Sequence, residues 1–190
     1  MNAPVESLNF DPANSLILSI DIQQRLAAAM DPDTMTRVRN KATAVLSAAR
    51  LMDVPIIVTE QYPRGLGSTL PELLDLLGEA PGIIEKTSFS CHRVEGVRKS
   101  LADFAGRRVL VMGMETHVCV WQSVRDLLDV GHKVAVITDA VCSRTELDRS
   151  VGLELCRQAG ATMISAESLL FDWVKDAKTE HFKAISRLVK

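Results

Sequence analysis

The residue best placed for chemistry is Cys119, which follows an apolar run and a polar corner. The run, residues 109–112, stops at Gly113, and a helical pattern then begins with Cys119 in its first turn. A helix start gathers unpaired N–H groups and the positive end of the helix dipole, and both favour a thiolate. The same N–H groups can hold a developing oxyanion. We therefore expect a nucleophilic Cys119 that reacts with iodoacetamide well below the ordinary thiol pKa of about 8.5.

Two further reactive side chains stand just after apolar runs. Asp21 follows residues 15–20, and Lys86 follows residues 83–85. Ligands of parallel α/β sheets bind outside the carboxyl ends of the strands, so an acid, a base and a thiol are expected at one edge. Each of the three residues also has a non-catalytic explanation. Cys119 could be a small buried hydrophobic residue, Asp21 a turn cap and Lys86 a solvated surface charge. Their joint occurrence at strand ends favours catalysis.

The segments that must position these residues alternate between strand and helix patterns. Strands are expected at residues 15–20, 55–59, 82–85, 108–112, 133–138 and 161–164. Helices are expected from a cap at Asp33 or Thr34 to about residue 51, at 72–77, 93–104, 117–130 and 146–159, and from 167 and 179. Strict alternation without hairpin signals indicates a parallel sheet with helices on both faces. We predict one α/β domain, residues 15–190, after an arm of residues 1–14. It is a three-layer α-β-α domain whose six-stranded parallel sheet has the Rossmann-like order 3-2-1-4-5-6.

Composition restricts the partners and the setting. A formal net charge of -2 gives no electrostatic case for nucleic acid or an anionic membrane surface. No apolar run approaches the ~20 residues that span a bilayer. Residues 1–11 hold acidic but no basic residues, unlike a secretory signal or a transit peptide. Four cysteines without CxxC spacing make a disulfide framework unlikely in a chain this long and favour a reducing, cytoplasmic setting.

Three motifs resemble the isochorismatase-like (cysteine hydrolase) superfamily. Asp21-Ile22-Gln23 is similar to its Asp-x-Gln after the first strand. Residues 86–90 (KTSFS) resemble its Lys-x-x-aromatic-Ser segment, and residues 113–120 (GMETHVCV) resemble its Gly-x-x-Thr-x-x-Cys-Val motif. Residues 59–68 (TEQYPRGLGS) are similar to the branch of isochorismatase-domain-containing proteins. The likeness runs from about residue 16 to the C-terminus.

The resemblance implies a catalytic triad of Asp21, Lys86 and Cys119. It also implies a cis peptide bond between Met114 and Glu115, which in the family turns the Glu115 N–H toward the site, beside that of Cys119, as an oxyanion hole. We expect a hydrolase of a small amide, or of a related C–N or ester-like substrate, with a covalent thioester intermediate. Asp21 takes the thiol proton and later returns it to the leaving group, and Lys86 stabilises both charges.

Substrate contacts are expected from loops at the same edge, namely from Gln23, Gln61, Tyr62 and Phe89. Nicotinamidases of the family carry a metal-binding aspartate and histidines in the loop after the second strand. Here the sequence of residues 60–63 is EQYP, and the four histidines show no ligand spacing. We therefore expect no metal and no cofactor, and nicotinamide becomes a less favoured substrate. True isochorismatases cleave a vinyl ether, a reaction in which the cysteine need not be the nucleophile, and nothing in this sequence identifies isochorismate as the substrate.

Other functions stay open at this point. A catalytically silent binding or assembly protein would keep the fold without the substrate. A haloacid-dehalogenase-type phosphatase also places an aspartate after the first strand and uses a later lysine, but it needs a second acid where this chain has Gln23. Spare apolar residues in the later helical segments, such as residues 169–171 and Trp173, predict a homo-oligomer of unspecified size.

Overall fold

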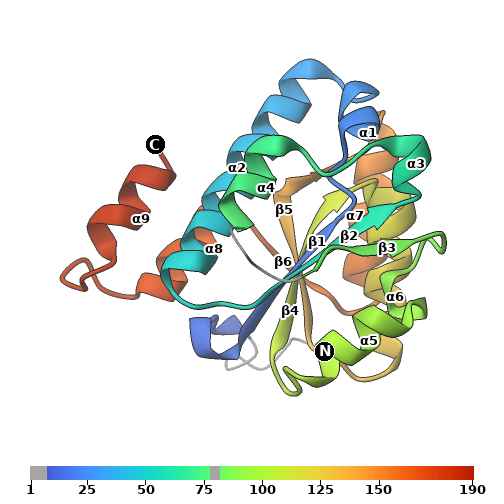
Figure 1. The fold of residues 1–190 in the computed structure, drawn as a ribbon. Helices are drawn as coiled ribbons and strands as arrows, with labels where there is room; N and C mark the ends of the chain where they lie inside the picture. The colour runs from blue at the N-terminus through green and yellow to red at the C-terminus, as the bar shows by residue number, and fades with distance from the viewer. Residues whose placement is uncertain (1–7, 78–81) are drawn as a thin grey trace.

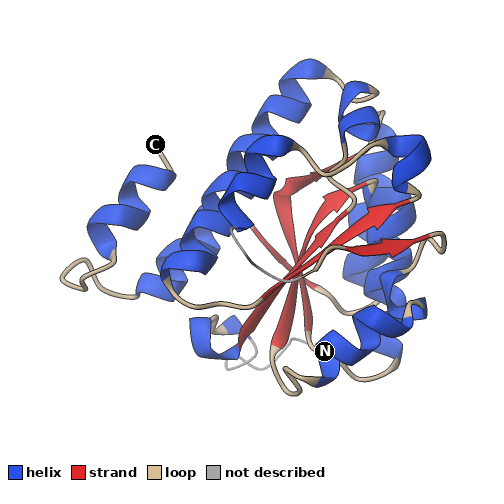
Figure 2. Cartoon of the chain, viewed as in Figure 1, coloured by secondary structure: helices blue, strands red, loops and turns tan. Residues whose placement is uncertain are grey.

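A parallel sheet forms the centre of the molecule. The computed structural model describes residues 8–77 and 82–190. Within them the sheet has six strands in the order β3-β2-β1-β4-β5-β6, which confirms the predicted order (Figures 1 and 2). The strands are β1 (Ser15–Ile20), β2 (Ile56–Gln61), β3 (Ile84–Lys86), β4 (Arg108–Met114), β5 (Val134–Cys142) and β6 (Thr162–Ile164).

Helices cover both faces of the sheet and make the three predicted layers. Figure 1 shows α2, α4 and α8 on one side, α5, α6 and α7 on the other, and α9 outermost. The helices are α1 (Gln24–Ala28), α2 (Pro32–Leu51), α3 (Pro63–Leu66), α4 (Pro71–Leu77), α5 (Glu95–Ala102), α6 (Trp121–Asp129), α7 (Glu146–Gln158), α8 (Ala166–Val174) and α9 (Phe182–Leu188). Single turns η2 (Pro12–Asn14), η3 (Cys91–Arg93) and η4 (Thr116–Val120) complete the elements.

The two layers of helices bury two separate apolar cores. In β1, Ile17 belongs to the core under α2 and α8, whereas Leu16 and Leu18 belong to the core under α5 and α6. Successive side chains of a strand point to opposite faces, so a strand covered on both faces is apolar throughout. That is why β1 was recognisable in the sequence as a short, mainly apolar run, in which the two serines, Ser15 and Ser19, are buried as well. None of the described helices is long and apolar enough to cross a membrane.

Several element boundaries differ from the sequence prediction. Helix α2 begins at Pro32, and its cap is Asp31, whose carboxylate accepts the Thr34 N–H at 2.8 Å. The predicted cap at Asp33 or Thr34 is therefore wrong, and proline at the first helical position is favourable because its missing N–H has no partner there. Strand β2 continues to Gln61, and Lys86 is the last residue of β3 rather than the residue after it.

Part of the predicted N-terminal arm packs on the domain. Phe10 is buried, and its N–H donates to the Asp172 carboxylate of α8 at 2.6 Å. Turn η2 follows and leads directly into β1. Residues 1–7, the rest of the predicted arm, lie outside the described residues.

Two glycines allow neighbouring elements to approach the turn that carries Cys119. Gly113 in β4 has a φ of 126° and pairs with Ile20 of β1, where a Cβ would collide with the Ile20 carbonyl oxygen. Gly152 of α7 faces η4, and a Cβ there would lie 2.7 Å from the backbone carbon of Thr116. Any side chain at either position would push β1 or α7 away from the end of β4.

Candidate active site

Asp21, Lys86 and Cys119 lie together at the carboxyl edge of the sheet. The Lys86 Nζ is 2.6 Å from the Asp21 Oδ2 and 3.7 Å from the Cys119 Sγ. The side chains of Asp21 and Lys86 are wholly buried, and Cys119 is 6% exposed. These residues are far apart in the sequence and are joined here by the ends of β1, β3 and β4.

The backbone of Asp21 is held in an uncommon conformation. Its φ is 51°, in the left-handed region that aspartate enters more readily than most residues. Its N–H donates to the Thr59 carbonyl at 3.1 Å, and its Oδ1 accepts the Thr59 hydroxyl at 2.8 Å. Thr59 of β2 therefore fixes both the backbone and the carboxylate of Asp21.

Lys86 is surrounded by acceptors. Besides Asp21 and Cys119, its Nζ donates to the Gln61 Oε1 at 2.7 Å and contacts the carbonyls of Ser88 and Phe89 at 3.2 and 3.3 Å. A buried charge is tolerated only where it is paired and hydrogen-bonded. The position of the ammonium is thus set by the ends of β2 and β3 and the loop after β3.

Cys119 lies in η4, one π-helical turn that leads into α6, rather than in the predicted α-helical first turn. The peptide bond from Met114 to Glu115 is cis, as the resemblance implied. The Glu115 carbonyl accepts the N–H groups of Val118 and Val120, and its carboxylate accepts the Arg144 side chain at 3.0 Å. Glu115 therefore anchors the turn on both sides.

A second thiol belongs to the same network. Cys91 is fully buried, and its Sγ is 3.6 Å from the Thr59 hydroxyl. Its N–H donates to the Ser123 Oγ at 2.9 Å, and that hydroxyl donates to the Cys119 carbonyl at 2.6 Å. In the sequence, Cys91 was distinguished only by lying close to residues 86–90. The roles of Thr59 and Ser123 had no signal, since both act through contacts with distant residues.

The electrostatics of the site differ from the sequence expectation. Burial above all, together with the negative charge of Asp21 and against the opposing charge of Lys86, raises the pKa of Cys119 to about 12. Burial also raises the pKa of Asp21 while Lys86 lowers it. Burial is the largest single influence on Lys86 and lowers its pKa, but the charge and hydrogen bond of Asp21 and the charges of the thiols Cys91 and Cys119 together outweigh it, and the net shift is upward. The resting site is therefore a protonated thiol beside an ion pair. The prediction of a lowered Cys119 pKa is therefore wrong, because the effect of burial on this thiol is larger than any effect of the helix start.

The four predicted substrate contacts divide into two kinds. Gln23 is fully buried, and its amide donates to the carbonyls of Gln61 and Gly67 at 3.1 and 2.6 Å. Gln61 in turn holds the Lys86 ammonium through its side-chain oxygen. Tyr62 and Phe89, by contrast, are 55% and 52% exposed. The two glutamine side chains therefore hydrogen-bond within the chain, whereas the two aromatic side chains, one after β2 and one after β3, are exposed to solvent.

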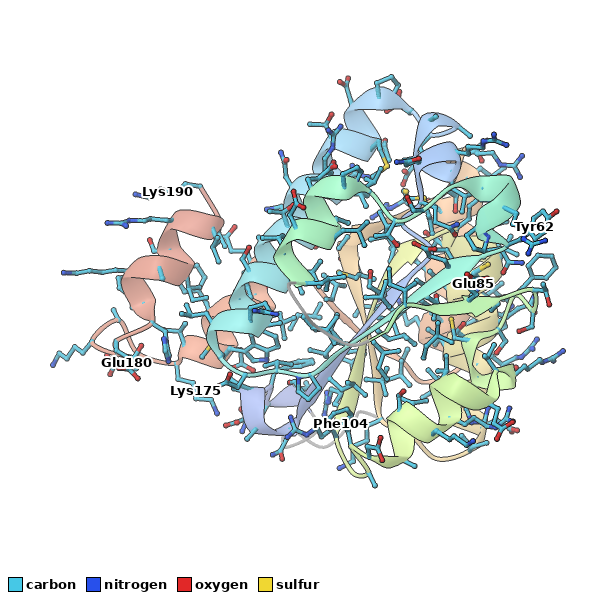
Figure 3. The ribbon with its side chains drawn as sticks, in the orientation of Figure 1. Tyr62, Glu85, Phe104, Lys175, Glu180 and Lys190 are labelled. Atoms are coloured by element: carbon cyan, nitrogen blue, oxygen red, sulfur yellow. The ribbon has the colours of Figure 1, made fainter. Side chains whose placement is uncertain are left out.

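A cavity of about 380 Å³ lies at the ends of β2 and β3, and among the described residues neither Asp21 nor Cys119 lines it. Its lining includes Tyr62, Arg64, Glu85 and Lys86. Figure 3 shows Tyr62 and Glu85 at the same edge of the molecule, at the ends of β2 and β3. Within residues 8–77 and 82–190, no group of three or more His, Cys, Asp or Glu side chains is arranged to hold a metal ion. His117 instead pairs with the Ser143 hydroxyl at 2.9 Å.

Comparison of the sequence with known proteins identifies the family of this chain. The model of the isochorismatase domain matches residues 15–168. The chain belongs to the isochorismatase family. It is 40% identical over 180 residues to isochorismatase domain-containing protein 2 of Bos taurus, covering 94% of this chain and 84% of that protein. It is 39% identical over 182 residues to the secreted isochorismatase effector Isc1 of Phytophthora sojae, with 94% and 86% covered.

A solved structure agrees with this assignment. The MAR1 ribonuclease from Caenorhabditis elegans superposes with a TM-score of 0.86 at 33% identity, covering 95% of this chain and 92% of that chain. The predicted resemblance to isochorismatase-domain-containing proteins is confirmed, and the family supports a hydrolase of small substrates. It also disfavours the phosphatase alternative.

Proposed function

We propose that this isochorismatase-family chain is a cysteine-dependent hydrolase of small amides, or of related C–N or ester-like substrates. The carrying observation is that one ammonium group, that of Lys86, contacts both the Asp21 carboxylate at 2.6 Å and the Cys119 sulfur at 3.7 Å. The adjacent cavity of about 380 Å³ falls in the range of small-ligand sites. The site thus combines a nucleophile, a base and a fixed positive charge beside space for a substrate.

In the first half of the proposed reaction, Asp21 acts as the general base. Because the pKa of Cys119 is raised to about 12, the thiol keeps its proton until a substrate is bound. As the sulfur attacks the carbonyl carbon, its proton passes to the Asp21 carboxylate and a C–S bond forms. The tetrahedral intermediate then breaks its C–N bond, and Asp21 returns the proton to the leaving amine. The product of this half is a thioester on Cys119.

In the second half, water resolves the thioester. Asp21 takes a proton from the water as its oxygen attacks the carbonyl carbon, and the C–S bond then breaks. The proton on Asp21 goes back to the Cys119 sulfur, and the carboxylic acid product leaves. Lys86 remains an ammonium throughout and stabilises whichever of its two neighbours carries the negative charge.

We assign the oxyanion hole to the backbone N–H groups of Glu115 and Cys119. Both groups belong to the turn directly after β4, and the Cys119 sulfur of that turn lies 3.7 Å from the Lys86 Nζ, which supports this assignment. Two fixed N–H donors aimed at a developing oxyanion are a common source of rate enhancement in acyl transfer. The bonds from the Glu115 carboxylate to Arg144 keep these donors in place.

The predicted contact residues take different parts in the proposal. Tyr62 and Phe89 contact the substrate, which their exposure at the rim of the site supports. Gln61 positions Lys86 through the 2.7 Å bond to its Nζ. Gln23 positions the backbone of Gln61, whose N–H it accepts at 2.7 Å. No metal or cofactor takes part in this scheme.

We also propose a homo-oligomer in the cytoplasm. Leu147 and Val151 are 74% and 49% exposed one turn apart on α7, which supports a subunit contact there. All four cysteines are free and buried, which suits a reducing compartment, although the Phytophthora relative is named as secreted. Light scattering of the purified chain tests the first proposal, and a monomer at micromolar concentration overturns it. Native chain recovered from the culture medium overturns the second.

The test of the proposed reaction is intact mass spectrometry with a panel of small amides and esters. The wild-type chain and Cys91→Ala should gain one acyl mass, and Cys119→Ala should gain none. Cys91→Ala is the matched control. Cys91 is a buried thiol that contacts Thr59, the threonine that also bonds Asp21, but it has no role in the proposed reaction. An acyl adduct on Cys119→Ala overturns the nucleophile assignment.

A labelled RNA oligonucleotide belongs in the same panel because one relative is named a ribonuclease. The net charge of -2 disfavours RNA as the substrate of this chain. RNA cleavage that disappears in Cys119→Ala would replace the small-substrate proposal. Absence of any reaction with the whole panel, in a folded chain, would favour a catalytically silent binding protein.

A further inference from the structure

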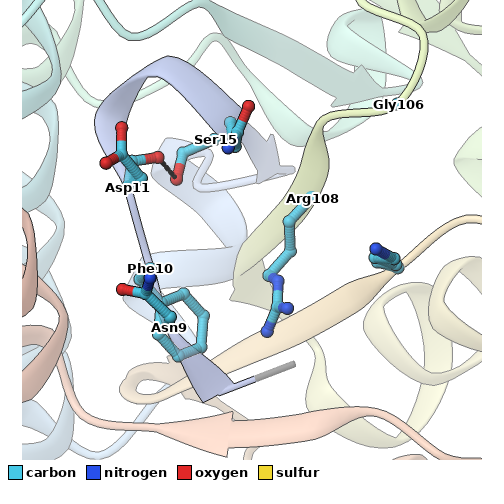
Figure 4. A pocket seen from close by; sticks show the side chains of 8 residues that line it. Asn9, Phe10, Asp11, Ser15, Gly106 and Arg108 are labelled. Atoms are coloured by element: carbon cyan, nitrogen blue, oxygen red, sulfur yellow. Dashed lines mark hydrogen bonds between the residues drawn. The ribbon is translucent and has the colours of Figure 1, made fainter. Parts of the chain in front are cut away.

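A second cavity lies at the opposite, amino edge of the sheet, at the starts of β1 and β4. Its volume is about 220 Å³, and its lining includes Phe10, Asn14, Ser15, Arg108 and Lys133 (Figure 4). Strand β1 runs six residues from this edge to Asp21, a length of roughly 20 Å. The cavity is therefore separate from the candidate active site, and a ligand bound in it would be independent of the proposed hydrolase chemistry.

Arg108, the first residue of β4, is the unusual member of this lining. It is only 8% exposed, and its guanidinium carbon lies 4.6 Å from the centre of the Phe10 ring. Among the described residues its guanidinium makes no hydrogen bond and no ion pair with a carboxylate within 4.0 Å. Figure 4 shows the side chain extending from β4 toward Phe10 and Asn9. Among the described residues the buried side-chain atoms without a hydrogen-bond partner belong to Thr69, Ser90 and Thr116, so the five N–H donors of Arg108 keep contact with the cavity rather than being wholly enclosed.

The carboxylates nearest this cavity have other hydrogen-bond partners, although the charge of Asp172 acts on Arg108 without a direct ion pair. The Asp172 Oδ2 accepts the Phe10 N–H at 2.6 Å. Asp11 accepts the Ala13 N–H at 2.9 Å and pairs with Lys175 at 3.2 Å. The Ser15 hydroxyl likewise donates to the Asp11 carbonyl at 2.7 Å. These contacts leave the donors of Arg108 facing the cavity, with the exposed Lys133 as a second positive charge.

We propose that this cavity binds a small oxyanion, with inorganic phosphate as the matching ligand. Planar guanidinium groups bind phosphate through two parallel hydrogen bonds, and the aromatic ring of Phe10 holds the guanidinium plane in place. The volume of about 220 Å³ is below the ~300–1,000 Å³ of sites for drug-sized molecules, so it suits an ion rather than a large metabolite.

The test is phosphate binding by the 190-residue chain, measured by ³¹P NMR line width and by thermal unfolding. Phosphate and chloride are compared at equal ionic strength, because a bound ligand raises the unfolding temperature in a saturable way. The wild-type chain should respond to phosphate and not to chloride. Arg108→Met should weaken apparent phosphate affinity at least ~10-fold, and Lys133→Gln about 3-fold, through loss of charge-assisted hydrogen bonds.

Arg107→Met is the matched control. Arg107 carries the same charge one position earlier, but its guanidinium donates to the Ser15 carbonyl at 3.2 Å and lies over Phe104 instead. Its variant should keep the wild-type phosphate affinity. Equal responses of the wild-type chain to phosphate and chloride, or unchanged affinity in Arg108→Met, would overturn the proposal.

Two more variants keep the test decisive. If Arg108→Met does not fold, Arg108→Lys keeps the charge and loses the two parallel donors, and unchanged phosphate affinity in that variant overturns the proposal. Glu6→Gln removes a carboxylate of the segment outside the described residues, four positions before Phe10. Phosphate binding by Glu6→Gln but not by the wild-type chain would overturn the proposal in favour of a carboxylate that the chain itself supplies.

Discussion

Each end of the sheet buries a cationic side chain, and the two cations differ in their hydrogen-bond and ion-pair partners. At the carboxyl end, the Lys86 ammonium has Asp21 at 2.6 Å and Gln61 at 2.7 Å. At the amino end, Arg108 is 8% exposed and has no carboxylate partner among the described residues. Burial alone therefore does not distinguish a catalytic cation from a ligand-binding one. A cation whose N–H donors all have acceptors within the chain can act on those neighbours, whereas a cation without such acceptors can donate hydrogen bonds to a ligand.

The sharpest test of this contrast is to remove the paired cation. Lys86→Met leaves the Asp21 carboxylate buried without its partner, and breaking such a pair lowers the free energy of unfolding by about 3–5 kcal/mol. Urea denaturation at neutral pH measures the loss. Adding Asp21→Asn should restore part of it because the second change removes the stranded charge. A loss below ~1 kcal/mol in Lys86→Met would show that the pair is not a stabilising unit.

The second test asks whether the carboxyl end works as a catalytic unit. Asp21→Asn and Lys86→Ala should each lower kcat/KM for a substrate found in the amide panel by at least ~100-fold, the usual effect of losing an acid–base group. Asp33→Asn, an exposed acid in the first turn of α2, should leave kcat/KM unchanged. Near-wild-type rates in either site variant would remove that residue from the proposed triad.

The pH profile of the same reaction gives the third test. The base form of Asp21 is the carboxylate, and burial raises its pKa above the ordinary aspartate value of 3.8. Activity should therefore fall as the pH drops through that raised pKa, at a higher pH than an exposed aspartate would give. An acidic limb of kcat/KM at or below the ordinary aspartate pKa would contradict this assignment.

The fourth test uses a buried neutral thiol, Cys156 of α7, which lies in the apolar core between the helices and the sheet. Burial raises the pKa of Cys156 from 9.0 to about 12. Between these values the thiol ionises only in the unfolded chain, so the unfolded state binds fewer protons and stability falls as the pH rises from 9 toward 12. Each such thiol contributes about 1.4 kcal/mol per pH unit. Cys156→Ala should make the measured slope shallower by that amount, and an unchanged slope would contradict the raised pKa.

The smallest expected effect concerns the cation without a partner. In phosphate-free buffer, Arg108→Met should change the free energy of unfolding by less than ~1 kcal/mol, because an apolar replacement removes a desolvation cost together with the contact to Phe10. Urea denaturation beside Lys86→Met measures the difference. A loss of about 3 kcal/mol or more at Arg108 would mean that both cations stabilise the fold alike, and the contrast would fail.

Much of the fold was predictable from local pattern. The run at residues 15–20 is apolar because β1 is covered on both faces, and the alternation of such runs with helical stretches indicated a parallel sheet. In such a sheet all strand ends meet at one edge, so residues as distant as Asp21 and Cys119 were expected there together. The motifs of the family gave the same residues independently.

The features of the site that could not be predicted from the sequence depend on contacts between distant residues and on burial. Thr59 looks like any strand threonine until its hydroxyl is seen on Asp21 at 2.8 Å. Gln23 sits next to the site in sequence, yet its amide is used entirely on the loop backbone. Arg108 looks like a solvated residue at a strand start, and no pattern of neighbours indicates that Phe10 covers it. The raised pKa of Cys119 was missed for the same reason.

The close packing of Gly152 against η4 has a consequence for how activity in this fold can be altered. A Cβ at that glycine would lie 2.7 Å from Thr116, so the segment bearing Cys119 has no slack on the α7 side. Tyr62 and Phe89 at the rim are more than half exposed, and a Cβ at the neighbouring Gly65 would meet the Tyr62 side chain at 2.5 Å rather than a backbone atom. Directed evolution toward new substrates should therefore accept changes at the rim and reject them along the cysteine segment. Natural divergence of substrate range in this family is expected to follow the same division.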